Sequence, residues 1–304
     1  MTTMNVTEFV NGEYFAHAGS ALAVSTLDGY RKLWRKLGPY FEGRDLALRV
    51  VDCQGILRQV YADSPHLNRT TLSHIKNFLS GVWSHALRMG ILDTDNPWRV
   101  ASIPNAPEPN TTYAYSAQEI EAMLAALKPP YDLIVLFMAG TGLRKSEARG
   151  VKWGDFDAKT LTLSVERAVW RSTVKTTKNK SSKAPIPVIP ELADRLVKFR
   201  GKAPASAYIF RDGNGNPLDF DNTARRKIIP ALEKAGIKWH GYHAMRRGLA
   251  TTLHSKGIAD KEIQRLLRHS DVATTQRAYI QTLPENVRTA MSTVNFGNGV
   301  VPPL

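Results

Sequence analysis

The chain contains a single cysteine, Cys53, among its 304 residues. One thiol excludes a disulfide framework and any zinc site built from several thiolates. Long apolar runs are also absent, since the longest, residues 133–139, is far shorter than the ~20 residues that a membrane-spanning helix requires. No charged stretch followed by an apolar one opens the chain in the manner of a secretion signal. We therefore expect a soluble, intracellular protein, cytoplasmic in a prokaryote, with no membrane partner.

Acidic side chains are scarce. The chain has 27 aspartates and glutamates against 41 lysines and arginines, so its formal net charge is +14. Residues 1–103 hold 11 basic and 9 acidic residues, a difference of +2, whereas residues 151–250 hold 20 and 9, a difference of +11. A positive surplus concentrated in one stretch favours a polyanionic partner, most often nucleic acid. Charge that serves only solubility remains the alternative interpretation.

Hydrophobic residues make up 43% of the chain, which is enough for packed cores, and the length favours two domains. The first 20 residues show little periodicity. Apolar residues then recur at steps of three and four, which predicts helices over residues 26–41, 46–62 and 68–89. We assign residues 1–103 to a helical bundle. Residues 104–115 contain three prolines and few apolar residues, so we predict a linker there.

The second predicted domain comprises residues 116–304. Ser116 and Glu119 have the spacing of a capping box, which predicts that a helix begins there. Further along, alternation of apolar and polar residues predicts short strands over residues 160–165, 168–174 and 184–189. The polar, basic segment 176–183 is expected at a hairpin tip between the last two strands. The fold class is therefore mostly α with a small antiparallel β-sheet (α+β).

Four side chains of this domain have the chemistry of phosphate binding, and a fifth can orient one of them. Arg144 and Arg246 each carry a fork of N–H donors that matches two phosphate oxygens. Glu147 lies one helical turn after Arg144, where it can orient that guanidinium. His243 lies three residues before Arg246, so the two share a helix face. His269 follows an apolar pair and can donate a hydrogen bond to a phosphate oxygen.

A phenol and two lysines complete the set of reactive groups. The oxygen of Tyr279 can attack phosphorus and hold it covalently, provided that nearby positive charge assists the phenol. Lys178 and Lys180 lie in the basic segment, and a lysine beside other cations can donate a proton to a leaving alkoxide. Each residue alone is better explained as an ordinary packing or surface residue. Only the order of the whole set favours a shared site.

The full order of these residues resembles the tyrosine recombinase (phage integrase) family. The segment TGLRKSEARGVKWGDFD is similar to the first conserved box of that family, and HAMRRGLATTL together with LLRHSDVATTQRAYI is similar to the second. The N-terminal part, which ends in GILDTDNPW, resembles the family's core-site-binding domain. The resemblance covers nearly the whole chain. It implies a core-site DNA-binding domain followed by a catalytic domain.

The resemblance also implies an activity, namely site-specific cleavage and rejoining of DNA through a covalent 3′-phosphotyrosyl intermediate, with no cofactor, metal or ATP. In that activity Arg144 and Arg246 would clamp the scissile phosphate. His243 would take part in proton transfer from the nucleophile, and His269 would hydrogen-bond the phosphate. Tyr279 would form the covalent bond.

The same resemblance implies a lysine that protonates the departing 5′-oxygen. Lys178 fits this role best, and Lys180 stays an alternative because the length of the hairpin varies in the family. Two features depart from the family pattern. Arg268 stands where glycine usually precedes the histidine of the second box, and ten positions separate His269 from Tyr279 where nine are common.

The implied partners are double-stranded DNA and three further copies of the chain, because recombination between two DNA sites uses four active sites in a tetramer. Accessory DNA-bending or directionality factors are a further expectation. Two alternatives stay open from the residues alone. One is a type IB-like DNA topoisomerase, which shares the covalent chemistry, and the other is a catalytically silent DNA-binding regulator on the same scaffold.

Overall fold

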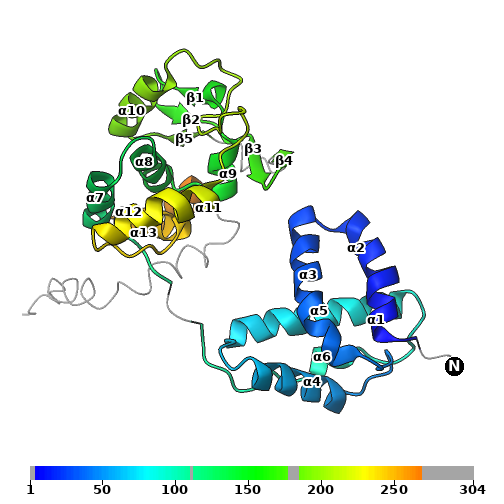
Figure 1. The fold of residues 1–304 in the computed structure, drawn as a ribbon. Coiled ribbons are helices and arrows are strands. Elements are labelled where there is room, and N and C mark those ends of the chain that lie inside the picture. Colours follow the sequence, from blue (N-terminus) through cyan, green and yellow to red (C-terminus); the bar gives the residue numbers. More distant parts are fainter. Residues whose placement is uncertain (1–3, 110–111, 177–184, 269–304) are drawn as a thin grey trace, which may run out of the picture. The chain divides into compact units, whose positions relative to one another are not determined.

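The computed structural model describes residues 4–109, 112–176 and 185–268 (Figure 1). The chain divides into two compact units, Met1–Asn110 and Thr111–Leu304. The division falls within the stretch in which the sequence predicts a linker. Ala106 is buried in the core of the first unit and Tyr115 in the core of the second. Each end of that stretch is therefore packed against its own unit.

The first unit is helical throughout its regular structure in the described residues. Its elements are α1 (Val6–Phe9), a π-helical turn (Val10–Tyr14), α2 (Phe15–Ala21), α3 (Val24–Leu37), a 3₁₀ turn (Gly38–Phe41), α4 (Val50–Asp63), α5 (Arg69–Arg88) and α6 (Pro97–Val100). The first 20 residues, which show little periodicity, are therefore largely helical. The buried side chains of Val6, Phe9 and Val10 join them to the core.

Aromatic side chains fill the core of the first unit. The rings of Trp83 and Trp98 meet edge to face at 5.4 Å, and the ring of Phe41 lies 6.0 Å from Trp83. The indole Nε1 of Trp83 donates a hydrogen bond to the carbonyl of Leu46 at 2.9 Å. The bond satisfies the buried indole N–H, and it also holds the segment before α4 against α5.

The helix predicted over residues 68–89 is confirmed as α5, whose first turn is capped by the side chain of Asn68. Two predicted boundaries are wrong. The helix predicted to start at residue 46 begins at Val50, where Asp52 accepts a hydrogen bond from the backbone N–H of Arg49 at 2.9 Å. The helix predicted over residues 26–41 tightens into a 3₁₀ turn at Gly38, because the proline that follows cannot donate a hydrogen bond.

The second unit is mostly helical with two small antiparallel sheets. Its elements are α7 (Ala117–Ala126), α8 (Tyr131–Thr141), α9 (Lys145–Gly150), a 3₁₀ turn (Trp153–Asp155), β1 (Phe156–Asp157), β2 (Thr162–Leu163), β3 (Arg167–Trp170), β4 (Thr173–Thr176), β5 (Ile186–Pro187), α10 (Pro190–Arg200), α11 (Phe220–Thr223), a π-helical turn (Ala224–Ile228), α12 (Ile229–Lys234), α13 (Tyr242–Ser255) and α14 (Asp260–Leu267). The predicted α+β class is confirmed.

Helix α8 is the centre of the second unit. Nearly all of its side chains are buried, and it contacts α7, α10 and α13 (Figure 1). The capping box predicted at Ser116 and Glu119 is confirmed at the start of α7. Gly248 lets α13 approach the segment before α7 closely, since a Cβ there would stand 2.1 Å from the carbonyl oxygen of Tyr115. These contacts fix α13, which carries His243 and Arg246, against α8.

The strands form sheets in the order β1-β2-β5 and β3-β4. The single strand predicted over residues 168–174 is wrong. The chain reverses at Arg171, which has a φ of 51°, so β3 and β4 form a hairpin within that range. The prediction that the strands on either side of segment 176–183 pair with each other is also wrong. The strand before the segment, β4, pairs with β3, whereas the strand after it, β5, pairs with β2. Lys178 and Lys180 themselves lie outside the described residues.

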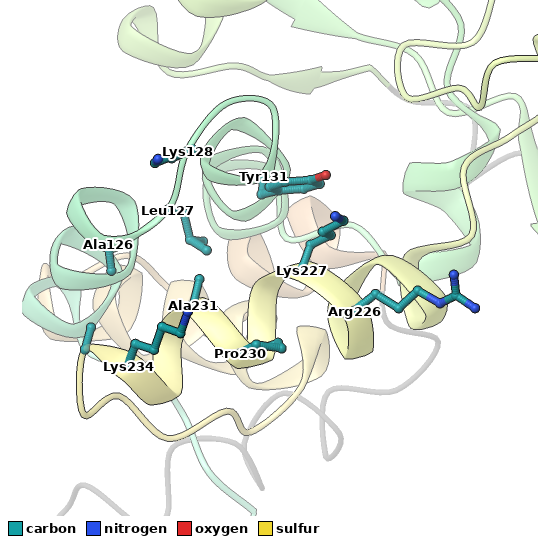
Figure 2. A pocket seen from close by; sticks show the side chains of 10 residues that line it. Ala126, Leu127, Lys128, Tyr131, Arg226, Lys227, Pro230, Ala231 and Lys234 are labelled. Carbon is teal, nitrogen blue, oxygen red and sulfur yellow. The ribbon is translucent and has the colours of Figure 1, made fainter.

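A pocket of about 480 Å³ opens between the α7–α8 connection and α12 (Figure 2). Four of its lining residues are cationic: Lys128, Arg226, Lys227 and Lys234. Its lining includes no residue of the predicted phosphate site, so it is a separate feature of this unit. Among the described residues, no helix combines the length and the apolar character needed to cross a bilayer.

Candidate active site

Arg144 is placed by the junction between α8 and α9. Helix α8 ends at Gly142, which has a left-handed φ of 61°. Arg144 is the N-cap of α9, and its backbone N–H donates a hydrogen bond to Oε2 of Glu147 at 2.8 Å. Its Nη1 donates to Oε1 of the same carboxylate at 3.0 Å. Glu147 therefore caps the helix and orients the guanidinium at the same time, which confirms the contact that their spacing predicts.

Arg246 lies on α13 and is only 4% exposed. Its Nη1 donates a hydrogen bond to the carbonyl of Gly142 at 2.5 Å, and its Nη2 donates to the carbonyl of Leu267. Burial and the neighbouring charge of Arg144 lower the pKa of Arg246 to about 9. The group still carries its charge at neutral pH. A buried guanidinium tied at both ends is fixed in orientation before any ligand arrives.

His243 lies one turn before Arg246 on the same face of α13, and its side chain is accessible to solvent. Loss of water on the buried side of the ring lowers its pKa, and the charges of Arg246, Arg247 and Arg144 lower it further. The imidazole is therefore neutral at pH 7. A neutral imidazole beside bound phosphate can accept a proton from a nucleophile.

The C-terminal end of α14 brings the two arginines together. The Nη2 of Arg144 donates a hydrogen bond to the carbonyl of Arg268 at 3.2 Å, and Arg246 uses the preceding carbonyl, that of Leu267. The last carbonyls of a helix have no partner within the helix and carry its partial negative charge, so cations are favoured there. Two guanidinium groups from elements far apart in sequence thus meet at one helix end.

Sequence reasoning missed the part that Arg268 plays in this cluster. Its side chain is 3% exposed, and its Nη2 forms an ion pair with Oε2 of Glu147 at 2.7 Å. Burial by itself would raise the pKa of Glu147, but Arg268 and Arg144 together lower it, so the carboxylate is ionised. The sequence marks Arg268 only as a departure from the family's glycine, and no periodicity distinguishes it from a solvated loop residue.

The structure thus brings Arg144, Glu147, His243 and Arg246 together. The remaining predicted site residues, Lys178, Lys180, His269 and Tyr279, lie outside the described residues. His269 directly follows Arg268 in the sequence. Within the described part of the chain, no cluster of three or more histidine, cysteine or carboxylate side chains could hold a metal ion.

The sequence model of the phage integrase family matches residues 115–286, which include the whole cluster. A curated relative, the tyrosine recombinase XerC-like protein of Caldanaerobacter subterraneus subsp. tengcongensis, is 31% identical over 261 residues. That alignment covers 74% of this chain and 66% of the relative's length. The family match spans more than half of the chain, so the chain belongs to the phage integrase family, the class of the tyrosine recombinases.

Solved structures with the same fold include two integrases bound to DNA. One is the Tn1549 transposon integrase in complex with a circular intermediate DNA, with a TM-score of 0.78, 21% identity and coverage of 95% of this chain and 99% of that one. The other is a lambda integrase tetramer bound to a Holliday junction, with a TM-score of 0.69, 18% identity and coverage of 91% and 78%. At these identities the likeness supports the α+β, two-unit fold of the family.

Proposed function

We propose that the protein is a site-specific DNA recombinase of the integrase kind, which cleaves and rejoins strands through a covalent 3′-phosphotyrosyl intermediate. One observation carries the proposal. The guanidinium groups of Arg144 and Arg246 are tied to consecutive carbonyls at the end of α14, beside the neutral imidazole of His243. Two oriented cations at one point match the non-bridging oxygens of a phosphodiester, whose charge increases in the transition state.

In the proposed reaction the phenol oxygen of Tyr279 attacks the scissile phosphorus, and the bond from phosphorus to the 5′-oxygen breaks. His243 takes part in removing the proton of the phenol. Lys178, with Lys180 as the alternative, gives a proton to the departing 5′-oxygen. His269 donates a hydrogen bond to a phosphate oxygen.

This exchange of one phosphate ester for another conserves the bond energy. A 5′-hydroxyl from a partner strand can therefore attack the phosphotyrosyl bond, release the phenol and seal the DNA. The reaction as proposed uses neither ATP nor a metal ion, because the arginines supply the positive charge and the side chains move the protons.

We further propose double-stranded DNA as the substrate and a homotetramer on two DNA sites as the active assembly. The surplus of positive charge in residues 151–250 supports a DNA partner. The DNA-bound integrases with the same fold support it as well. The proposal places the protein in the cytoplasm of a prokaryotic cell, acting at the nucleoid, with accessory DNA-bending or directionality factors as further partners.

The test is covalent capture. Attachment sites are first mapped on fragmented host DNA, and nicked duplexes that carry a mapped site are then used as suicide substrates, because loss of the short cut strand prevents resealing. The wild-type chain should form an adduct that survives denaturation. The Tyr279→Phe variant should bind the same duplex with the same Kd and form none. A wild-type chain without any adduct on host DNA would sink the recombinase proposal, and an undiminished adduct in the variant would identify another nucleophile.

A further inference from the structure

Arg268 occupies a backbone position that an arginine rarely adopts. It is the C-cap residue that directly follows α14, with φ 54° and ψ 46°, in the left-handed region. This conformation costs an L residue free energy that glycine avoids. The side chain of Arg268 is also charged and only 3% exposed. A charged group buried in this way needs a compensating contact.

Glu147 supplies that contact. One carboxylate oxygen, Oε2, accepts hydrogen bonds from Nη2 of Arg268 at 2.7 Å and from the backbone N–H of Arg144 at 2.8 Å. The other, Oε1, accepts from Nη1 of Arg144 at 3.0 Å. The carboxylate therefore bridges the two guanidinium groups and joins the start of α9 to the end of α14.

Arg268 also contacts Arg144 directly through its backbone, because its carbonyl accepts a hydrogen bond from Nη2 of Arg144 at 3.2 Å. Arg144 is thus held by Arg268 in two ways, through this carbonyl and through Glu147. The preceding carbonyl, that of Leu267, holds Arg246. The conformation of the chain at residues 267–268 therefore determines the positions of two carbonyls, each of which accepts a hydrogen bond from one of the phosphate-binding arginines.

The charge balance of the cluster adds a second effect. The guanidinium groups of Arg144 and Arg268 share the single carboxylate of Glu147, so the ion pair with Arg268 offsets part of the negative charge that would otherwise be paired with Arg144 alone. Less of the positive charge of Arg144 is then compensated within the protein, so more remains for a phosphate.

Direct contact between Arg268 and DNA does not fit this arrangement. The Nε and Nη1 atoms of Arg268 are buried, and among the described residues they have no hydrogen-bond partner. Its remaining nitrogen, Nη2, is engaged by Glu147. The side chain therefore acts on the other charged groups of the cluster and not on a ligand at the surface.

We propose that Arg268 is a positioning residue of the phosphate site, which holds Arg144 in place through Glu147 and keeps its charge available to the scissile phosphate. This inference rests on the proposed recombinase function. It assigns a role to the one residue of the cluster that stands where the family usually has glycine. The positioning acts through Glu147, so the effects of changing the two residues should not be independent.

The experiment measures Kd and the single-turnover rate of covalent capture for Arg268→Gly, Arg268→Lys, Glu147→Gln and the double variant Glu147→Gln with Arg268→Gly. Arg268→Gly relieves the backbone conformation and should fold. We expect it to slow capture at least tenfold while Kd changes less than threefold. Arg268→Lys, which restores the charge, should recover most of the rate. In the Glu147→Gln background, removal of Arg268 should add less than a threefold loss.

Arg195→Gln is the matched control, since it breaks an ion pair with Asp132 elsewhere in the same unit and should leave the capture rate unchanged. Capture by Arg268→Gly within threefold of wild type would overturn the inference. A loss of the same size with and without Glu147→Gln would overturn it too, because Arg268 would then act independently of Glu147. The recombinase proposal fails separately, if the wild-type chain forms no adduct at all.

Discussion

At the scale of single residues, the candidate site depends on which groups are charged. Arg246 keeps its charge although burial lowers its pKa to about 9. The neighbouring His243 loses its charge, because burial and, after it, the positive surroundings lower its pKa below the ordinary value of 6.5. One cluster thus supplies fixed cations for phosphate and a neutral base within one helical turn. The division of roles follows from burial and from the chemistry of the two side chains.

This division predicts a pH dependence. A lowered pKa means that His243 stays neutral down to a pH below 6.5, so its ability to accept a proton is lost only below that value. We expect the second-order rate constant of covalent capture, followed from about pH 5 to about pH 9, to be flat near neutrality and to fall with an apparent pKa below 6.5. This rate constant reports on the free enzyme.

The matching variant is His243→Gln, which keeps a polar side chain but cannot act as a base at these pH values. It should capture DNA roughly 10²- to 10⁴-fold more slowly, the usual range for acid–base catalysis, and the acid limb of its profile should disappear. If the variant keeps the same acid limb, another group titrates there and His243 is not the base.

At the scale of elements, the site depends on where three helices end or begin. Helix α8 ends at Gly142, α9 begins after Arg144, and α14 ends at Leu267. A Cβ at residue 142 would stand 2.7 Å from a methyl carbon of Leu267 and 2.9 Å from one of Leu249. Glycine is favoured there by its left-handed φ, and any larger residue would force the ends of these two leucine side chains, from α14 and α13, to shift.

Gly142→Ala should therefore disturb both the fold and the site. The left-handed conformation alone should destabilise the protein by about 1–2 kcal/mol, measured by urea unfolding. The added methyl group should also displace the side chain of Leu267, the residue whose carbonyl holds Arg246, so we expect covalent capture to slow by roughly tenfold, or ~1.4 kcal/mol.

Gly236→Ala is the control for backbone strain, since Gly236 has a φ of 72° in the same unit and no atom lies within 4 Å of the position of an added Cβ. It should lose similar stability but keep its capture rate. Equal capture rates for the two variants would show that the junction at Gly142 does not position the arginines.

The elements also show what sequence patterns can and cannot predict. The periodicity predicts α5 to within one residue at each end, because the long amphipathic stripe and the Asn68 cap indicate the same start for the helix. The turn at Arg171 was missed, because no glycine or asparagine there indicates a reversal. Spacing predicted the pairs of Arg144 with Glu147 and of His243 with Arg246, since each pair lies on one helix.

The burial of Arg268 has no such local signature. A charged residue after a helix is normally solvated, and only the packing of α14 against α13 brings it to Glu147. Contacts within one helix can be read from spacing. A contact between residues 121 positions apart depends on the tertiary fold, which periodicity does not encode.

At the scale of the whole molecule, the covalent chemistry does not by itself decide the outcome of the reaction. A 5′-hydroxyl that returns to its own phosphotyrosyl bond after rotation relaxes supercoiled DNA, as a type IB-like topoisomerase does. A 5′-hydroxyl that crosses to another duplex joins two sites. Exchange of all strands between two duplexes requires four active sites, which is why we propose a tetramer of the chain as the recombining assembly.

We therefore expect strand exchange to dominate when two sites are present. On a supercoiled plasmid with two mapped attachment sites, the wild-type chain should produce recombinant circles, and mutation of either site should abolish them. Covalent capture at the remaining site should persist, because cleavage itself needs only bound DNA. Tyr279→Phe should yield neither product. Gel electrophoresis resolves the topoisomers, and sequencing identifies the recombinant junctions. Relaxation of one-site and two-site plasmids at the same rate, without recombinant junctions, would assign the chain to relaxation and not to exchange.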